Sequence, residues 1–514
     1  MIMYNRLIEH PYVNIISNSI FKNLSTIGIL AVAWYYYNKY KYKRNKIASF
    51  LLTLPFVSKK ISNKLVEQSN QLQESLKTSY INFNYLPNNK TDKKDLINRL
   101  SLIPKINKNF ISGIIYSDDE FDKDILYFYN KYSRSNPLHP DIYPEIRMME
   151  IDVINVCKFL YKNKDGCGNI TSGGTESILL SCLTYRDKCK QENNINSPNI
   201  IGFNTIHPAF DKAGHYFNIK IIKVKNIVEM KSKINSNTIC LVGSAPEYSY
   251  GLIDPILEIN ELAIKYKVNF HIDACMGGFL IPFINKFNFI NFNLDGVTSI
   301  SLDTHKYGYS PKGSSVLLFK NPNFKKYQHF INKDWCGGVY ATPTILGSKS
   351  GGIIAATWAS IFLRGLDNYK HISSEIVENL YLIKNEIIQN SDIEIIGEPE
   401  LNIIALKSNS LNIYSIANEM KKKSWNLSIM QNPPSFHFCI TNNHNKDICK
   451  KFSTDLLDSC KIVKENNDSE LEGTLALYGC SSNLESSLFI EEIIQDYIFL
   501  LSQNNISYRY NLKL

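Results

Sequence analysis

Short apolar runs alternate with helix-like stretches between about residues 150 and 330. The apolar runs predict strands near residues 200, 220, 240, 270, 300 and 317. Between them, residues 177–190 and 256–267 repeat apolar positions at the spacing of an amphipathic helix. Strands that alternate with helices form a mostly parallel sheet with helices on both faces. The pattern therefore predicts an α/β fold for this part of the chain.

The pattern changes on either side of this region. After about residue 370, helices mix with a few strand-like runs such as 393–397 and 437–441, which predicts a smaller α+β domain. Residues 43–110 are polar and helix-like. A chain of 514 residues is too long for one ordinary core. We expect a lumenal N-terminus at 1–23, a transmembrane helix at 24–42, a helical segment at 43–148, a large domain at 149–368 and a small domain at 369–514.

The apolar run Leu24–Tyr37 has no charged residue. As a helix it spans about 21 Å, and extension to Tyr42 brings it to about 28 Å, close to the ~30 Å hydrocarbon core of a bilayer. Tyrosines and lysines at its end suit the interface, and the basic residues that follow place the remainder of the chain in the cytosol. Two alternatives are a signal peptide, although no small-residue cleavage site follows, and a buried helix, although the run is apolar on all sides.

Charge and cysteine content narrow the class of partner. The formal net charge is +9, but its densest cluster, 39–46, directly follows the apolar run, which suits a membrane flank better than a nucleic-acid groove. The chain has 11 cysteines and no CxxC pair. We therefore expect no nucleic-acid binding, no disulfide framework, no metal site and a reducing compartment.

The segment 301–308, SLDTHKYG, directly follows a strand-like run and carries the strongest chemical signal. A lysine at the end of a buried strand is poorly placed for a surface role. Schiff-base chemistry needs an amine held at a fixed point, whose pKa burial can lower. Lys306 is therefore a candidate to carry a cofactor as a Schiff base, although a surface-loop lysine remains the simple alternative.

Two further segments suit the same cofactor. Asp273 ends the run 269–273, where a buried acid is costly unless it meets a partner such as a protonated pyridine nitrogen. Gly174 and Thr175 open an apolar helix, whose N-terminal N–H groups suit a phosphate. Each alone could be a loop cap or a helix cap. With Lys306 they describe one pyridoxal-phosphate site, and His207, which lies between them in sequence, could stack on the cofactor ring.

Six segments together match one known family: 135–150, 169–180, 207–217, 271–280, 296–315 and 335–348. They closely resemble the sphingosine-1-phosphate lyase family, which belongs to the group II pyridoxal-phosphate decarboxylases of fold type I. The pieces SNPLHPD and THKYGYSPKGSS are the specific ones, since the others are shared across the superfamily. The resemblance implies a mostly parallel sheet of the seven-stranded type between helices. It also implies that the segment 43–148 contributes to a dimer and its active site, and that the large domain 149–368 binds the cofactor.

The resemblance also implies roles for individual residues. Lys306 would bind the cofactor covalently, Asp273 would pair with the pyridinium nitrogen and His207 would stack on the ring. The other implied cofactor contacts are Gly174, Thr175, His305 and Ser348, with Gly347 and Ser348 reaching the cofactor of a dimer partner. The implied substrate and catalytic groups are Tyr116, His139, Lys312 and, more weakly matched, Tyr250.

The implied reaction is retro-aldol cleavage of a phosphorylated long-chain base by a homodimer at the endoplasmic reticulum membrane, with its catalytic part in the cytosol. Two departures bear on the substrate. Lys349-Ser350 stands where the family usually has Arg-Pro, and 117–120 reads SDDE where a glycine pair is usual. The general base stays open between a tyrosine and the substrate phosphate. An amino-acid decarboxylase and a non-catalytic, membrane-tethered binding protein are the rival interpretations.

Overall fold

The computed structural model describes residues 90–101, 106–118, 120–466, 494 and 498. The fold below belongs to one compact unit of the chain, 91–471. The segment 24–42, expected to span a membrane, lies outside the described residues. Among the residues that are described, none forms a helix of the length and apolarity needed to cross a bilayer.

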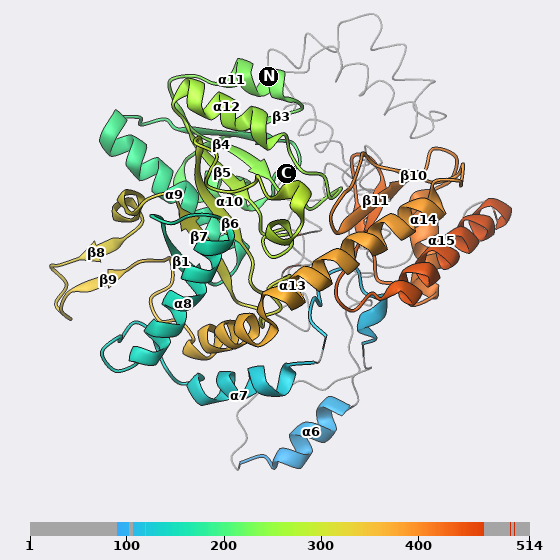
Figure 1. Cartoon of the computed structure of the whole chain (residues 1–514), viewed down its shortest axis with the longest axis horizontal. Coiled ribbons are helices and arrows are strands. Elements are labelled where there is room, and N and C mark those ends of the chain that lie inside the picture. Colours follow the sequence, from blue (N-terminus) through green and yellow to red (C-terminus); the bar gives the residue numbers. More distant parts are fainter. Residues whose placement is uncertain (1–89, 102–105, 119, 467–493, 495–497, 499–514) are drawn as a thin grey trace, which may run out of the picture. The chain divides into compact units, whose positions relative to one another are not determined.

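A seven-stranded sheet forms the centre of this unit (Figure 1). Its strand order is β1-β7-β6-β5-β4-β2-β3, and β6, β5, β4, β2 and β3 run parallel while β7 is antiparallel to both its neighbours. The strands are β1 (Cys167–Thr171), β2 (Asn199–Phe203), β3 (Lys220–Val224), β4 (Thr238–Ser244), β5 (Asn269–Asp273), β6 (Val297–Leu302) and β7 (Ser315–Phe319).

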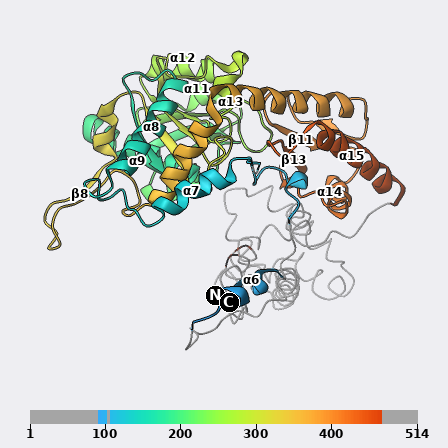
Figure 2. The same ribbon diagram turned by 60° about the horizontal axis from the view of Figure 1, so that its bottom comes forward.

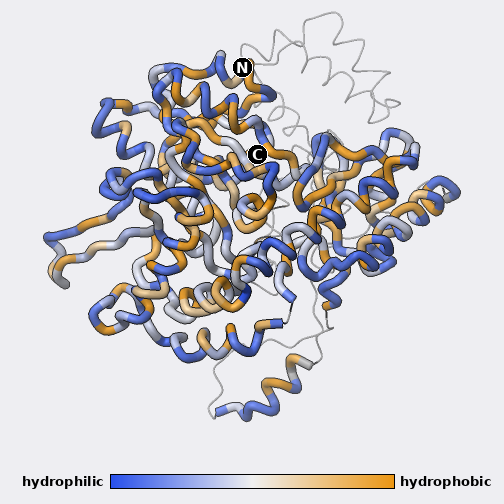
Figure 3. The backbone as a smooth tube through the Cα atoms, viewed as in Figure 1, coloured by the Kyte–Doolittle hydropathy of each residue, from blue (hydrophilic) through white to orange (hydrophobic). Residues whose placement is uncertain are grey.

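Helices cover both faces of this sheet. On one face, α9 (Gly174–Asn193) and α10 (Ala209–Phe217) pack on Val242, Leu317 and their neighbours. On the other, α8 (Pro144–Leu160) lies against Leu318. There α12 (Ile256–Tyr266) also meets Gly243, while α11 (Ile227–Lys233) follows β3. Figure 3 shows the apolar residues gathered along the inner elements, as burial of a sheet between helix stripes requires.

A long helix, α13 (Gly351–Ile387), leads from the large sheet to a smaller one, and its helical backbone is interrupted at Gly365, where φ is 67° (Figure 2). The small sheet has the order β10-β11-β13-β12 and is antiparallel throughout. Its elements are β10 (Glu394–Ile395), β11 (Ile403–Lys407), α14 (Ile413–Lys422), β12 (Ser428–Met430), β13 (Ser435–Cys439) and α15 (Lys446–Asn466). The remaining elements are α6 (Lys93–Ser101), η1 (Lys108–Phe110), α7 (Asp122–Tyr132), η2 (Ile281–Phe283), η3 (Asn285–Phe287), η4 (Pro322–Tyr327), β8 (Phe330–Asn332) and β9 (Tyr340–Thr342).

The predicted fold class is confirmed, and six of the seven central strands match the six predicted apolar runs. The pattern did not reveal β1, because its sequence CGNIT has a glycine and an asparagine where a buried strand usually has apolar residues. Strand β1 pairs antiparallel with β7 and leads directly into α9. It therefore places the glycine-rich start of that helix beside the ends of the central strands.

Candidate active site

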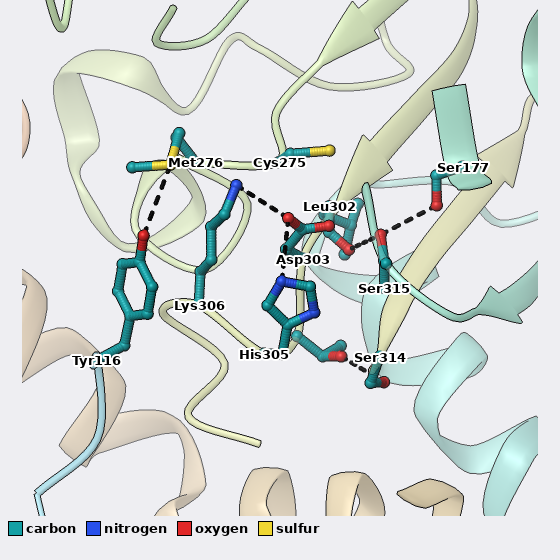
Figure 4. Close-up of polar contacts among 12 residues, drawn as sticks. Tyr116, Ser177, Cys275, Met276, Leu302, Asp303, His305, Lys306, Ser314 and Ser315 are labelled. Carbon is teal, nitrogen blue, oxygen red and sulfur yellow. Dashed lines mark hydrogen bonds and ion pairs between the residues drawn. The ribbon is translucent and has the colours of Figure 1, made fainter. Parts of the chain in front are cut away.

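Lys306 lies in a tight turn that follows the end of β6. Its Nζ atom is 2.9 Å from Oδ2 of Asp303, three residues earlier. The carboxyl group of Asp303 is almost fully buried, and 19% of the Lys306 side chain is exposed. Figure 4 shows Lys306 and His305 converging on this carboxylate. The turn therefore fixes the lysine amine at one point, as covalent attachment of a cofactor requires.

The electrostatics of Lys306 differ from the sequence-based expectation. Burial is the largest single influence and would lower the pKa of its amine, but Asp303, with smaller contributions from Tyr116 and Cys275, raises that pKa above its ordinary value. Burial would likewise raise the pKa of Asp303, but Lys306 and His305 together lower it. The expectation of a lysine pKa lowered by burial was therefore wrong for this structure, because the sequence alone did not place the counter-charge.

Two buried polar atoms beside Lys306 have no hydrogen-bond partner among the described residues: Nδ1 of His305 and Oδ1 of Asp303. The other ring nitrogen of His305, Nε2, is 3.5 Å from Oδ2 of Asp303. Buried polar atoms are nearly always paired in folded proteins. An unpaired imidazole nitrogen at this position is therefore available to a bound polar group.

The start of α9 closes the same space. A side chain at Gly174 would place its Cβ 2.8 Å from both Oδ1 of Asp303 and Sγ of Cys275, so only glycine fits. Gly173 has a φ of 151°, which also favours glycine. The first-turn N–H groups of a helix have no partner within the helix. These donors and His305 Nδ1 together fit the phosphate of pyridoxal phosphate.

The glycine-rich loop and first turn of α9 form the α9 cradle, and Glu176 fixes its shape. It is buried, and its two carboxylate oxygens accept hydrogen bonds from the backbone N–H groups of Ser172, at 2.6 Å, and Ile345, at 3.0 Å. Behind it, the hydroxyl of Ser177 lies 2.7 Å from that of Thr171 and 2.9 Å from that of Ser315. Side chains of α9 itself therefore hold the loop that precedes the helix. Thr175, at the start of the helix, has an exposed side chain.

Asp273 ends β5, where the sequence analysis placed it. Its Oδ1 atom accepts hydrogen bonds from the backbone N–H of Cys275, at 3.1 Å, and from the hydroxyl of Ser301, at 3.3 Å. Only 6% of the residue is exposed. Cys275 links the two acids: burial raises the pKa of its thiol, and Asp273 and Asp303 raise it further. Asp273, Asp303 and Lys306 therefore belong to one site.

Tyr116 and Lys312 border the amine of Lys306. The Tyr116 side chain is buried, its hydroxyl lies 4.0 Å from Sδ of Met276, and its ring packs edge-on against Tyr307. Lys312 Nζ lies 4.7 Å from the centre of that Tyr116 ring. Burial raises the pKa of Tyr116 above its ordinary value, whereas burial and the neighbouring Lys306 lower the pKa of Lys312.

Four other predicted residues make contacts with groups outside this cluster. His139 and His207 are exposed, and Nδ1 of His207 accepts a hydrogen bond from the N–H of Ala209. Tyr250 donates a hydrogen bond to the carbonyl of Asn432, at 2.9 Å. Ser348 is exposed, and its hydroxyl accepts a hydrogen bond from the side-chain amide of Asn136 at 3.0 Å. The backbone carbonyl of Asn136 accepts a hydrogen bond from the backbone N–H of His139. The loops that carry His139 and Ser348 are thus joined to each other. The roles of all four residues stay predictions.

The two departures from the family pattern both make ion pairs. Lys349 Nζ lies 2.8 Å from Glu150 in α8 and 3.3 Å from the carbonyl of Ile170 in β1. Asp118, where the family usually has a glycine pair, accepts a hydrogen bond from Arg364 at 3.3 Å. The Arg364 side chain is buried, so this acid provides a partner for a buried charge.

Asp303 is the site residue that sequence reasoning did not select. An acid three residues before the lysine, directly after a buried strand, was the available signal. It could not be interpreted without knowing that the turn folds the two side chains together.

The fold and the site define a class. The model of the pyridoxal-dependent decarboxylase conserved domain matches residues 135–409. A glutamate decarboxylase of Lactobacillus brevis superimposes with a TM-score of 0.67 at 18% identity, over 76% of this chain and 97% of that one, which shows the fold alone. The protein is a pyridoxal-phosphate-dependent lyase of fold type I.

Closer relatives narrow the class. Sphingosine-1-phosphate lyase 1 of Rattus norvegicus is 38% identical over 91% of this chain and 87% of its own length. The solved structure of a sphingosine-1-phosphate lyase from Burkholderia pseudomallei is 30% identical, with a TM-score of 0.72, and covers 75% of this chain and 94% of that one. The chain belongs to the sphingosine-1-phosphate lyase family.

Proposed function

We propose that this enzyme cleaves the C2–C3 bond of a phosphorylated long-chain base, such as sphingosine 1-phosphate, to a long-chain aldehyde and phosphoethanolamine. The observation that carries the proposal is the convergence of Lys306, Asp273 and the α9 cradle on one buried site in a chain of this family. The reaction belongs to the degradation of sphingolipids.

The cofactor site divides its work among three elements. When bound, pyridoxal phosphate supplies an electron-accepting ring that takes up the electron pair of the broken bond. The Lys306 amine would hold the cofactor aldehyde, and the Asp273 carboxylate would accept a hydrogen bond from the protonated ring nitrogen. The first turn of α9, with Gly174 and Thr175, would hold the cofactor phosphate together with His305 Nδ1.

The proton of the substrate C3 hydroxyl must leave as the bond breaks. Tyr116 interacts electrostatically with the Lys306 amine, but burial raises the pKa of its phenol, as it does for Tyr250. Both tyrosines are therefore better suited to keep a proton than to remove one. This favours the substrate's own phosphate as the base, with Tyr116 orienting the hydroxyl.

The substrate phosphate needs hydrogen-bond donors near the site. Lys312 lies beside Tyr116, and its ammonium can make charge-assisted hydrogen bonds to a phosphate. His139 is a second candidate donor, supplied by the loop that Asn136 joins to Ser348.

The assembly and location complete the proposal. Residues 347 and 348 would reach the cofactor of a partner subunit in a homodimer. The apolar segment 24–42 would anchor the enzyme in the endoplasmic reticulum membrane, into which a single-chain lipid phosphate partitions. The catalytic part would then lie in the cytosol. The N-terminal segment 43–148, the large domain 149–368 and the small domain 369–514 remain the proposed divisions.

The test is an absorbance spectrum of the purified full chain with pyridoxal phosphate, followed by addition of sphingosine 1-phosphate and detection of aldehyde and phosphoethanolamine. The Lys306→Ala chain is measured in parallel. A visible-edge absorbance band that needs Lys306, with both products formed, supports the proposal. The band without aldehyde, but with carbon dioxide from an amino acid, would replace it with the decarboxylase interpretation. Absence of the band would refute it.

A further inference from the structure

The sheet interior behind Asp273 contains an unusual row of polar side chains. His271 and Asp273 occupy alternate positions of β5, and the parallel register pairs them with Ser299 and Ser301 of β6. All four residues are at most 6% exposed. Side chains at alternate positions share one face of a sheet, and burial of polar groups there is costly unless they are hydrogen-bonded. The row therefore needs a structural reason.

Short contacts join these residues into one hydrogen-bond chain. Ser301 Oγ lies 3.3 Å from Oδ1 of Asp273 and 3.2 Å from Nε2 of His271. On the other side of the ring, Nδ1 of His271 lies 2.6 Å from Oγ of Ser299. Ser299 Oγ is in turn 2.5 Å from the hydroxyl of Tyr185, a fully buried residue of α9. The chain thus runs from the helix through both strands to the acid.

The number of protons available fixes the direction of donation along this hydrogen-bond chain. Ser301 donates its single hydroxyl proton to Oδ1 of Asp273. Ser301 then accepts from Nε2–H of His271. Burial lowers the pKa of His271 to about 4, so at neutral pH the ring holds one proton and Nδ1 is an acceptor. Ser299 therefore donates to Nδ1 and accepts from Tyr185. The opposite direction would turn the Ser301 proton away from the acid.

We propose that Ser301, His271, Ser299 and Tyr185 are positioning residues that hold the Asp273 carboxylate oriented for the cofactor ring nitrogen. The inference rests on the role proposed above for Asp273. Each group donates its proton toward the acid, so the influence of a substitution falls with its distance along the chain.

The experiment uses the cofactor-loaded full chain with the pyridine nitrogen labelled with ¹⁵N. Ser301→Ala and His271→Leu are expected to move the ring-nitrogen resonance toward the unprotonated position and to lower kcat about tenfold with little change in KM. His271→Gln keeps an N–H donor toward Ser301 and is expected to recover much of both losses. Tyr185→Phe removes only the far end of the hydrogen-bond chain, so we expect a loss in kcat of about twofold and a small shift of the resonance in the same direction.

Ser181→Ala is the matched control, since Ser181 is also a buried serine but donates to the Ile178 carbonyl outside this chain. It is expected to leave the resonance in place. An unchanged resonance in both Ser301→Ala and His271→Leu, with the cofactor band intact, overturns this inference alone. If either of these variants fails to fold, the other one and Tyr185→Phe carry the test, and an unchanged resonance in both overturns it. If the parent chain binds no cofactor, this inference and the proposed function both fall. If it binds cofactor but releases no aldehyde, only the proposed function falls, because the resonance needs no substrate.

Discussion

The predicted site divides into two regions with different environments. Around Lys306, Asp273 and Asp303 the side chains are largely buried and pair with one another. Around His139 and Ser348 the side chains are exposed, and their loops contact each other. Strand ends of one chain suffice to build the first region. The second gains a defined environment only if another surface covers it, which is the place that the proposed homodimer gives to a partner subunit.

The largest expected effect comes from removing the amine of the buried region. Lys306→Ala should lower kcat/KM by about 10³-fold or more, roughly 4 kcal/mol of transition-state stabilisation, because no other described lysine takes its place beside Asp303. Aldehyde release and the absorbance band are the measurements. Lys320→Ala, at a lysine that binds the carbonyl of Asp295 on the surface, is the control and should keep both. Substantial activity in the Lys306→Ala chain would show that the buried region is not the catalytic one.

Asp303→Asn probes the counter-charge of the same region. Breaking a buried ion pair leaves one charge uncompensated, so the cofactor-free variant should lose about 3 kcal/mol of unfolding free energy at neutral pH. The pKa of Asp303 is lowered in the fold, so its contribution is present above the ordinary aspartate range and is lost as pH falls through the folded value. The pKa of Lys306 is raised, so that group stays charged throughout this range.

The difference between parent and Asp303→Asn should therefore shrink as the solution becomes acidic. Urea unfolding at neutral and acidic pH measures it. Asp295→Asn is the control, because this acid is exposed and lies 3.8 Å from its lysine. A stability difference that stays constant from neutral to acidic pH would argue that the loss comes from packing and not from charge.

In the exposed region, His139→Ala should raise KM for a phosphorylated substrate about tenfold while kcat changes less, since one charge-assisted donor to the phosphate is lost. Steady-state kinetics measure this, with the exposed His215→Ala of α10 as control. Mixing His139→Ala with Lys306→Ala chains sharpens the comparison. A KM that returns toward the parent value in the mixture means that His139 serves the partner's site, whereas a KM that stays high places it in the site of its own chain.

How far the sequence predicts each region follows from what the pattern can show. Apolar runs revealed six strands, and Lys306 and Asp273 stood out because each follows such a run. Strand β1 was missed because Gly168 and Asn169 interrupt its apolar character. Contacts between strands were beyond reach, since the pairing of His271 with Ser299 depends on a register that neither strand encodes alone.

Exposed residues set a different limit. His139 and Ser348 were selected only through resemblance to a family, and His207 first by its place in the sequence between Gly174 and Asp273. Neither periodicity nor burial distinguishes an exposed histidine or serine with a function from one without. The structure gives the positions of these residues and leaves their roles as predictions. The buried acids and amine can be argued from geometry because their contacts lie within one chain.

The smallest expected effect lies where the two regions meet. Lys349 follows Ser348 in the exposed loop, yet its amine reaches Glu150 at 2.8 Å and the carbonyl of Ile170 at 3.3 Å, and only 13% of its side chain is exposed. Lys349→Met should lower the free energy of unfolding by about 1–2 kcal/mol, because Glu150 and the carbonyl lose a donor.

Lys349→Arg restores the residue usual in the family, and its planar fork can serve both acceptors, so stability should stay within about 0.5 kcal/mol of the parent. Urea unfolding of both variants is the measurement. Lys384→Met is the control, since its partner Glu398 is 89% exposed and such pairs contribute little. A loss in Lys349→Met no larger than in Lys384→Met would mean that this lysine does not tie the exposed loop to α8 and β1. The position of the loop would then depend on the proposed partner subunit alone.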